Sequence, residues 1–400
     1  KVPISLGSFK EESNRASDLS NLELKALEEL KLLVSDAINK GLFSGASPSS
    51  AASISHQEAS IWGVPLMKDD RTDAVLLKFL RARDFKVDES FAMLRNTMKW
   101  RSDFNVDELL REDLGQDPEK IVFMHGRDKD GHPVCYNVYG EFQNKDLYAK
   151  TFSDEEKRMR FLRWRIQFLE RSIRNLDFNP GGINTMFQIS DLKNSPGPSQ
   201  KELRVTTRQA LQILQDNYPE LVAKQVFINV PWWYMVFYAM IISPFLTQRT
   251  KSKFVFSGPT STAKTLFKYI SPEQVPTMYG GLSVDLCECN PDFSMDDPAT
   301  ELAIKPSTKQ TVEIIVNEKC TIVWELRVVG WEVGYSAEFL PESERGYTVI
   351  IEKARRMSPS DEPVVSNRFV VNEVGKILLI VNNPTPKRKQ LLYRFKVLPI

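Results

Sequence analysis

The sequence has few of the residues that build metal centres or disulfide frameworks. It contains four cysteines and three histidines in 400 residues. Cys287 and Cys289 have no second cysteine pair at zinc-ribbon distance, and His56, His125 and His132 lack the spacing of metal ligands. We therefore expect no metal site. Low cysteine usage without a secretory leader favours a reducing, cytoplasmic compartment.

An excess of charge of one sign is also missing. The chain carries 53 basic and 52 acidic side chains, a net charge of +1. This balance excludes a general affinity for nucleic acid, so any basic site must be local. A hydrophobic share of 42% and a charged share of 26% are typical of globular proteins, and 400 residues allow two or three domains. Because the chain begins at Lys1 rather than Met, we expect a piece of a longer protein.

Catalytic patterns are absent as well. The sequence has no G-x-S-x-G elbow, and its carboxylates form no recognisable pair. Residues 258–265, GPTSTAKT, imitate a phosphate-binding loop, but Ala263 replaces the second glycine and Pro259 removes an amide that a phosphate would need. We therefore interpret this stretch as a strand-to-helix turn, and we expect no enzymatic activity and no cofactor.

Long hydrophobic runs are rare, and the most apolar one is interrupted. Val226–Asn229 predicts a buried strand, and Trp232–Ser243 predicts a helix that is apolar on every side. A transmembrane helix needs ~20 residues. Pro231 and Pro244 leave only about 12, which span ~18 Å. The segment therefore predicts a buried helix or one wall of an apolar cavity.

A basic stretch follows this apolar helix. It carries Arg249, Lys251 and Lys253 and leads into a predicted strand, Phe254–Ser257. An apolar wall beside a basic loop favours a cavity whose mouth handles an anion. A helix buried in the core of a large α/β domain stays an open alternative.

The N-terminal third is predicted to be helical. Leu19–Ile38 predicts an amphipathic helix capped by Ser20 or Asn21, with an apolar stripe. The stripe consists of Leu22, Leu27, Leu30, Leu33 and Val34. Packing on the body of the protein and binding of a partner are both open for this helix. Gly41–Ser60 has the composition of a linker, and Asp69–Leu110 predicts a small helical bundle whose basic end, Arg81 to Arg83, is expected to be solvated.

The middle of the chain alternates strands and helices. Ile121–Gly140 predicts a hairpin with an Asp-Gly turn, and Ser153–Leu176 predicts a long helix opened by a capping box of Ser153 and Glu156. A strand at Ile183–Ile189 and a helix at Ser199–Asp216 follow. This order predicts a mostly parallel sheet with helical crossovers.

After Leu282 the pattern becomes all-β. Short runs with period two, separated by Gly, Pro and Asn turns, predict an antiparallel β-sandwich. The runs are Val312–Val316, Thr321–Val328, Tyr347–Ile351, Asn367–Val371, Ile377–Val381 and Leu391–Val397. Lys387, Arg388 and Lys389 predict a basic hairpin tip, for which edge protection and contact with an anionic bilayer are both open.

Several of these motifs together resemble a known family. Residues 79–90 (FLRARDFKVDES), 228–233 (INVPWW), 243–256 (SPFLTQRTKSKFVF) and 275–281 (VPTMYGG) are similar to the CRAL-TRIO family of yeast-type phosphatidylinositol-transfer proteins. The terminal sandwich resembles a GOLD domain, and the whole arrangement resembles the plant patellins. The expected fold is therefore an α/β CRAL-TRIO lipid-binding fold with a helical N-terminal tripod, followed by an all-β GOLD β-sandwich. The expected domains are a helical and linker extension at 1–68, the CRAL-TRIO helical region at 69–112, the lipid-binding domain at 113–283 and the GOLD domain at 284–400.

The resemblance implies a set of site residues. Matched positions place the lipid headgroup at Arg83, Glu220, Thr250 and Lys253. The apolar helix matches a mobile gate over the acyl cavity, with Trp232, Trp233, Val236, Phe237, Met240 and Ile241 as its residues. One departure is Asp84, where the yeast protein has a basic residue; it weakens the expectation of an identical headgroup geometry.

The expected function is phosphoinositide binding and lipid transfer at membranes, with phosphatidylinositol or a phosphoinositide as the bound ligand. A phospholipid needs an apolar trough, where each buried CH₂ contributes ~0.8 kcal/mol, and a few charged donors for its phosphate. The patellin resemblance implies vesicle trafficking, including cell-plate formation in cytokinesis, and peripheral attachment to the plasma membrane or cell plate. A carrier of an apolar isoprenoid such as tocopherol, and an adaptor that binds proteins through the GOLD domain, stay open.

Overall fold

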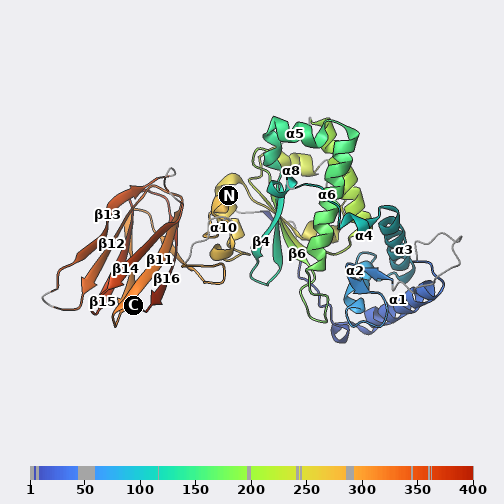
Figure 1. Cartoon of the computed structure of the whole chain (residues 1–400), viewed down its shortest axis with the longest axis horizontal. Coiled ribbons are helices and arrows are strands. Elements are labelled where there is room, and N and C mark those ends of the chain that lie inside the picture. Colours follow the sequence, from blue (N-terminus) through green and yellow to red (C-terminus); the bar gives the residue numbers. More distant parts are fainter. Residues whose placement is uncertain are drawn as a thin grey trace. The chain divides into compact units, whose positions relative to one another are not determined.

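The computed structural model shows two compact units, Lys1–Ser261 and Thr262–Ile400 (Figure 1). It describes residues 4–5, 9–43, 59–115, 117–195, 200–239, 243, 246–284, 292–343, 346–358, 361 and 363–399. The predicted α/β unit followed by an antiparallel sandwich is confirmed by the strand order of the two units.

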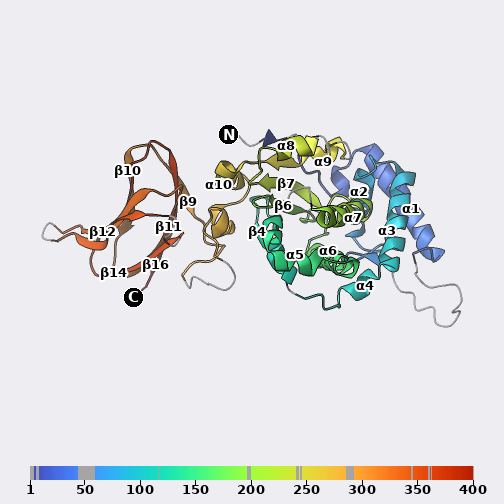
Figure 2. The same ribbon diagram turned by 90° about the horizontal axis from the view of Figure 1, so that it is seen from above.

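The N-terminal helices gather at one end of the first unit (Figures 1 and 2). They are α1 (Asn21–Asn39), α2 (Thr72–Arg81), α3 (Val87–Asp103) and α4 (Val106–Leu109). Ser20 caps α1 in a capping box with Glu23, which decides between the two predicted caps. Leu27, Leu30 and Val34 are buried as predicted, but Leu22 is 81% exposed, so the buried stripe begins later than expected. Most of the predicted linker lies outside the described residues.

A six-stranded sheet forms the centre of the first unit, in the order β1-β8-β7-β6-β5-β4. Its strands are β1 (Ile4–Ser5), β4 (Val122–Arg127), β5 (Pro133–Val138), β6 (Met186–Asp191), β7 (Val222–Ile228) and β8 (Phe254–Phe256). Strands β5 to β8 run parallel, β4 forms the predicted antiparallel hairpin with β5, and β1 pairs antiparallel with β8. A further small hairpin joins β2 (Ser60–Ile61) to β3 (Val64–Pro65).

Three longer helices connect these strands: α5 (Lys145–Phe152), α6 (Glu155–Arg174) and α7 (Lys201–Asn217). The predicted N-cap of α6 is wrong by one residue. Asp154, not Ser153, accepts the hydrogen bond from the Lys157 amide, because a carboxylate one position later reaches the free amides of the first turn. Strand β6 likewise begins at Met186 rather than Ile183.

In its described residues, the crossover from β7 to β8 contains two short α-helices. The first, α8 (Tyr234–Phe237), begins two residues after the predicted start of the apolar helix. Met240 and Ile241 lie outside the described residues. The second, α9 (Gln248–Ser252), is helical where a basic loop was predicted, because the Thr247 side chain accepts the Thr250 amide and caps it. None of the helices in the described ranges combines the length and apolarity needed to cross a bilayer.

The second unit contains a short helix, α10 (Thr262–Leu266), and a β-sandwich. One sheet has the order β10-β15-β12-β13 and the other β14-β11-β16-β9. The strands are β9 (Thr300–Ile304), β10 (Thr308–Val316), β11 (Cys320–Val329), β12 (Val333–Pro341), β13 (Val349–Met357), β14 (Val365–Val371), β15 (Gly375–Asn383) and β16 (Lys389–Leu398). Side chains from both sheets, including Trp324, Tyr335 and Ile377, form one buried core. Strands β9 and β12 were not predicted.

Arg327 and Lys389 are basic side chains of the sandwich that are buried against carbonyl groups. Arg327 on β11 donates to the carbonyls of Thr277 and Gly281 at 2.6 and 2.7 Å. Lys389 is 7% exposed, and its ammonium donates to the Gly330 carbonyl at 2.6 Å. The predicted basic tip was therefore wrong in including Lys389, and only Lys387 and Arg388 are exposed there.

Candidate functional site

One face of the central sheet is covered by helices α6 and α8. In the parallel register, Asn137, Ser190, Phe227 and Phe256 lie side by side across four strands and share this face. Arg165 on α6 donates to Asn137 at 3.2 Å. On α8, the Tyr234 ring lies 6.2 Å from Phe227. The face is therefore polar below α6 and aromatic below α8.

The aromatic part of this face forms its own cluster with α8 and the described residues beside it, 232–239, here called the α8 segment. Phe227 stacks on Phe256 with ring centroids 4.8 Å apart, and Tyr238 lies 5.0 Å from Phe256. Leu192 and Val230 complete the buried set. The α8 segment thus covers an apolar surface on the sheet.

The outer side of the α8 segment presents apolar side chains to solvent. Trp232 is 86% exposed and Val236 is 58% exposed. Trp233 contacts Tyr234 through a ring pair 6.0 Å apart, and Phe237 ends the helix. Of the predicted gate residues in the described part of the chain, Trp232 and Trp233 directly precede this short helix, and Val236 and Phe237 lie in it.

A buried ion-pair cluster lies at the amino edge of the same sheet. Glu220 precedes β7 and Lys253 precedes β8, and because these strands are parallel neighbours, the two residues meet. The Lys253 ammonium lies 2.9 Å from Glu220 Oε2. Arg249 donates to both carboxylate oxygens, from Nε at 2.9 Å and from Nη2 at 3.1 Å. Burial alone would raise the pKa of Glu220, but the bonds and charges of Arg249 and Lys253 outweigh it and hold this pKa below its usual value.

A second lysine, Lys78, binds the backbone of Glu220. Glu220 adopts a left-handed backbone conformation, with φ of 53°. Its carbonyl accepts a hydrogen bond of 2.8 Å from Lys78, which also donates to Asn184 Oδ1 at 2.8 Å. Lys78 is 3% exposed, and burial lowers its pKa to about 7. Helix α2 is thereby tied to the sheet edge.

The four predicted headgroup residues are arranged unequally. Glu220 and Lys253 form a direct ion pair. Arg83 donates to the Ala82 carbonyl, and the Thr250 hydroxyl bonds to that of Thr247, so both make local contacts. Lys253 is 7% exposed, and Glu220 holds its ammonium inside rather than in solvent.

Sequence reasoning missed the partners that complete the cluster. Arg249 was placed in the basic stretch without a role, and Arg81 was expected to be solvated, yet its side chain is 11% exposed. Their signal was present in the sequence as basic residues beside predicted strand and helix ends. No local pattern marked the acidic residues that meet them.

One of those acids, Glu12, comes from residues 9–15, here called the N-terminal strap. Glu12 accepts hydrogen bonds of 2.8 and 2.5 Å from the two terminal nitrogens of Arg249, and it lies 3.5 Å from Arg81 Nε. The Phe9 ring lies 4.6 Å from the Lys253 ammonium and 5.3 Å from the Arg249 guanidinium. The strap therefore lies on the ion-pair cluster.

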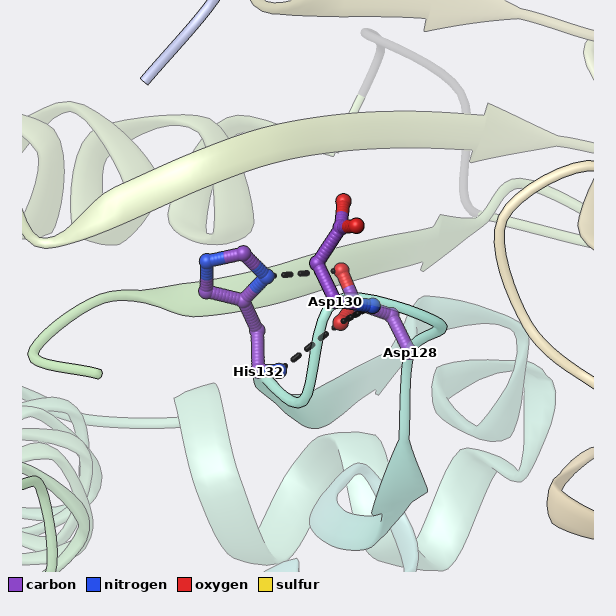
Figure 3. A group of neighbouring side chains, drawn as sticks. All are labelled: Asp128, Asp130 and His132. Carbon is purple, nitrogen blue, oxygen red and sulfur yellow. Dashed lines mark hydrogen bonds and ion pairs between the residues drawn. The ribbon is translucent and has the colours of Figure 1, made fainter. Parts of the chain in front are cut away.

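Glu11 fixes the strap to the turn between β4 and β5. Figure 3 shows Asp128, Asp130 and His132 of this turn. Its carboxylate lies 2.7 Å from His132 Nε2, and Asp128 lies 2.8 Å from His132 Nδ1. Burial would lower the pKa of His132, but the two carboxylates raise it to about 10. Asp128, Asp130 and His132 are close enough to hold a cation. However, a protonated ring with a carboxylate on each nitrogen offers no lone pair to a metal.

Comparison with known proteins decides the family. A model described as the Patellin-1-like C-terminal GOLD domain matches residues 305–389, the CRAL/TRIO domain matches 117–281 and the CRAL/TRIO N-terminal domain matches 26–96. Patellin-3 of Arabidopsis thaliana is 64% identical over 399 residues, which cover 100% of this chain and 79% of that protein. The chain belongs to the patellin family. Patellin-5 of the same plant is 65% identical, and this patellin-family chain spans 57% of its length. The predicted domain limits inside the chain stay predictions.

More distant relatives share the first unit. The phosphatidylinositol transfer protein SFH5 of Meyerozyma guilliermondii is 28% identical over 239 residues, covering 55% of this chain and 67% of that protein. The crystal structure of Sfh5 superimposes with a TM-score of 0.52 at 21% identity, covering 66% of this chain and 89% of that one. The patellin-family chain therefore shares its α/β fold with Sfh5.

Proposed function

We propose that this protein binds phosphoinositides and transfers them at membranes. The observation that carries the proposal is the pairing of two surfaces on one sheet. An aromatic face lies under α8, and the ion-pair cluster of Glu220, Lys253 and Arg249 lies at the edge of the same sheet. A phospholipid needs both an apolar surface for its chains and charged donors for its phosphate. The relative named as a phosphatidylinositol transfer protein supports the proposal.

The aromatic face is the proposed place for the acyl chains. Phe227, Phe254 and Phe256 point to the side that Tyr234 and Tyr238 cover. The α8 segment moves away from the sheet when the acyl chains enter. The aromatic rings of the sheet that the segment covers then contact hydrocarbon in its place. Each CH₂ buried there contributes ~0.8 kcal/mol.

The polar cluster is the proposed place for the headgroup. Lys253, Arg83 and Thr250 supply donors for the phosphate, and Glu220 accepts from inositol hydroxyls. Because Glu220 and Lys253 now bind each other, a headgroup must exchange partners with this pair rather than enter an empty site. That exchange selects a ligand carrying both an anion and hydroxyl groups over an uncharged lipid.

Trp232 and Val236 give the α8 segment a membrane-facing side. Tryptophan favours the interface between water and hydrocarbon because its ring is amphipathic. The two side chains are 86% and 58% exposed, so they can contact a bilayer without unfolding. We propose that this contact opens the gate.

The remaining parts of the proposal rest on family membership. We infer a peripheral membrane protein of vesicle trafficking, including cell-plate formation, that acts at the plasma membrane or cell plate without catalysis or a cofactor. The sandwich is proposed to bind protein partners. The aromatic face on its own would also suit an uncharged isoprenoid such as tocopherol, which makes such a carrier the second candidate.

Two measurements on the full chain separate these candidates. Native mass spectrometry identifies the lipid that copurifies, and a vesicle assay measures phosphatidylinositol transfer. We expect the double variant Glu220→Ala/Lys253→Ala to lose transfer, whereas Lys251→Ala on the neighbouring helix α9 retains it. A double variant that loads phosphatidylinositol normally would overturn the headgroup assignment and favour the isoprenoid carrier.

A further inference from the structure

Glu12 binds Arg249 as a phosphate group would. Both of its oxygens accept from the two terminal nitrogens of the guanidinium, at 2.8 and 2.5 Å. Arg81 approaches the same carboxylate at 3.5 Å. Parallel bonds from one guanidinium, with a second beside it, form the arrangement by which arginines bind carboxylates and phosphates alike.

Glu12 is also the carboxylate of the cluster that a ligand can displace most easily. Its side chain is 45% exposed, against 16% for Glu220, 27% for Arg249 and 11% for Arg81. The strap has other anchors on both sides of it. Strand β1 pairs with β8 before it, and the Asn14 amide after it donates to the Gly182 carbonyl at 2.9 Å. Glu12 can therefore leave the arginines while the rest of the strap stays attached.

The charge balance defines what would replace Glu12. Arg81, Arg249 and Lys253 face two carboxylates, Glu12 and Glu220. Without Glu12, Glu220 is the one carboxylate among the described residues that forms ion pairs with any of these three cations, which leaves an excess of two positive charges among the ion-paired groups. Glu23 acts on Arg81 through its charge without an ion pair to it. Burial lowers the pKa of Arg81, as expected for a cation withdrawn from water. A phosphate monoester carries about −1.5 to −2 charges at neutral pH and matches this excess, whereas a phosphodiester carries about −1.

We propose that Arg81 and Arg249 form a phosphate-monoester site that Glu12 of the N-terminal strap occupies when no ligand is bound. The inference rests on the proposed function, and it specifies the ligand class: an inositol ring with monoester phosphates, on a lipid or free in solution. Phosphatidylinositol itself has only a diester and leaves Glu12 in place. The strap thus favours polyphosphorylated headgroups, since only these displace it.

The test compares two variants of the full chain with matched controls. Each variant replaces one charged side chain by neutral glutamine. Glu12→Gln removes the competing carboxylate, and Glu28→Gln removes an exposed acid of α1 that pairs with Lys31. Arg249→Gln removes the binding guanidinium, and Lys251→Gln removes a charge from the same helix. Three probes are used: vesicles with phosphatidylinositol, vesicles with phosphatidylinositol bisphosphate, and soluble inositol trisphosphate.

We expect Glu12→Gln to strengthen binding of the bisphosphate vesicles and of inositol trisphosphate about 10-fold, and Arg249→Gln to weaken both about 10-fold or more, as for charged hydrogen bonds. Binding of phosphatidylinositol vesicles should change less than about 2-fold with Glu12→Gln, and both controls should behave as wild type. Hydrogen exchange at residues 9–15 should rise when inositol trisphosphate binds.

Three results would overturn the inference. The first is that Glu12→Gln leaves the binding of inositol trisphosphate unchanged or weaker. The second is that Glu12→Gln strengthens the binding of phosphatidylinositol vesicles and of bisphosphate vesicles equally. The third is that hydrogen exchange in the strap does not change when inositol trisphosphate binds. Since Glu12 is half exposed, its variant tests the site even if Arg249→Gln fails to fold. Failure of the proposed function is distinct: wild type would bind neither type of vesicle, while the soluble arm would still show the predicted changes.

Discussion

Replacement of Lys253 by methionine tests whether Lys253, in addition to Arg249, stabilises the buried carboxylate of Glu220. Methionine keeps the apolar stem and removes the ammonium that lies 2.9 Å from Glu220 Oε2. The side chains of Lys253 and Glu220 are 9% and 16% exposed, so solvent replaces the lost bond poorly. Removal of one member of a fully buried pair typically costs about 3–5 kcal/mol.

The expected cost is smaller here because Glu220 keeps two bonds from Arg249, at 2.9 and 3.1 Å. The loss of one charged hydrogen bond costs about 1.5–3 kcal/mol. For a unit of this size each kcal/mol lowers Tm by about 2–4 °C, so Lys253→Met should lower it by about 3–12 °C. Lys251→Met is the control, and a surface change of this kind stays within about 0.5 kcal/mol.

The assay is urea and thermal unfolding of the full chain, extended to a double-mutant cycle with Glu220→Gln. A coupling free energy of about 1 kcal/mol or more is expected between residues in direct contact. If Lys253→Met matches Lys251→Met in stability, Lys253 extends to water in solution, and our account of the cluster is wrong. A coupling near zero would show that Arg249 alone neutralises Glu220.

Three further predictions concern other parts of the chain. Since the pKa of His132 is raised from 6.5 to about 10, its charge stabilises the folded state fully below about pH 6.5 and not above about pH 10; the difference in unfolding free energy between wild type and His132→Gln should narrow over that range, and a constant difference would contradict the ion pair. Trp232→Ala should weaken cosedimentation with vesicles while Tm stays within about 1 °C, because the side chain is 86% exposed; unchanged cosedimentation would exclude it from the membrane contact. Reversal of Lys387 and Arg388 to glutamate should weaken binding to anionic vesicles at low salt by about 1 kcal/mol per residue, and unchanged binding would leave the tip as a solubilising turn.

Periodicity predicted the elements that bury one clear stripe. Leu27, Leu30 and Val34 recur at helical spacing, and Ile322 and Trp324 alternate on a strand; all five are buried. Strand β12 was missed although its buried residues alternate with Gly, Ser and Glu at the period of a strand, because Gly and Ser are also typical of the turns between strands. Helix ends were less certain, as Asp154 shows, because neighbouring polar residues compete for the same amides.

The site was predictable only where it lies beside a recognisable strand end. Glu220 and Lys253 were predicted from the family resemblance, and because both precede parallel strands, the sheet brings them to one edge. The strap has no periodicity, and its position depends on pairs far apart in sequence, such as Glu11 with His132 and Glu12 with Arg249. Such pairs leave no local pattern, because either partner alone resembles an ordinary surface charge.

The hydrogen bonds of Arg327 determine which sequence changes this part of the chain can tolerate in evolution. Its guanidinium belongs to a strand of the sandwich, yet it binds carbonyls of residues 277 and 281, which match the CRAL/TRIO model. Backbone carbonyls are present whatever the side chain, so substitutions in that segment leave the contact intact. Insertions or deletions there would shift the two carbonyls and leave a buried cation without acceptors. The segment should therefore tolerate changes of residue far better than changes of length.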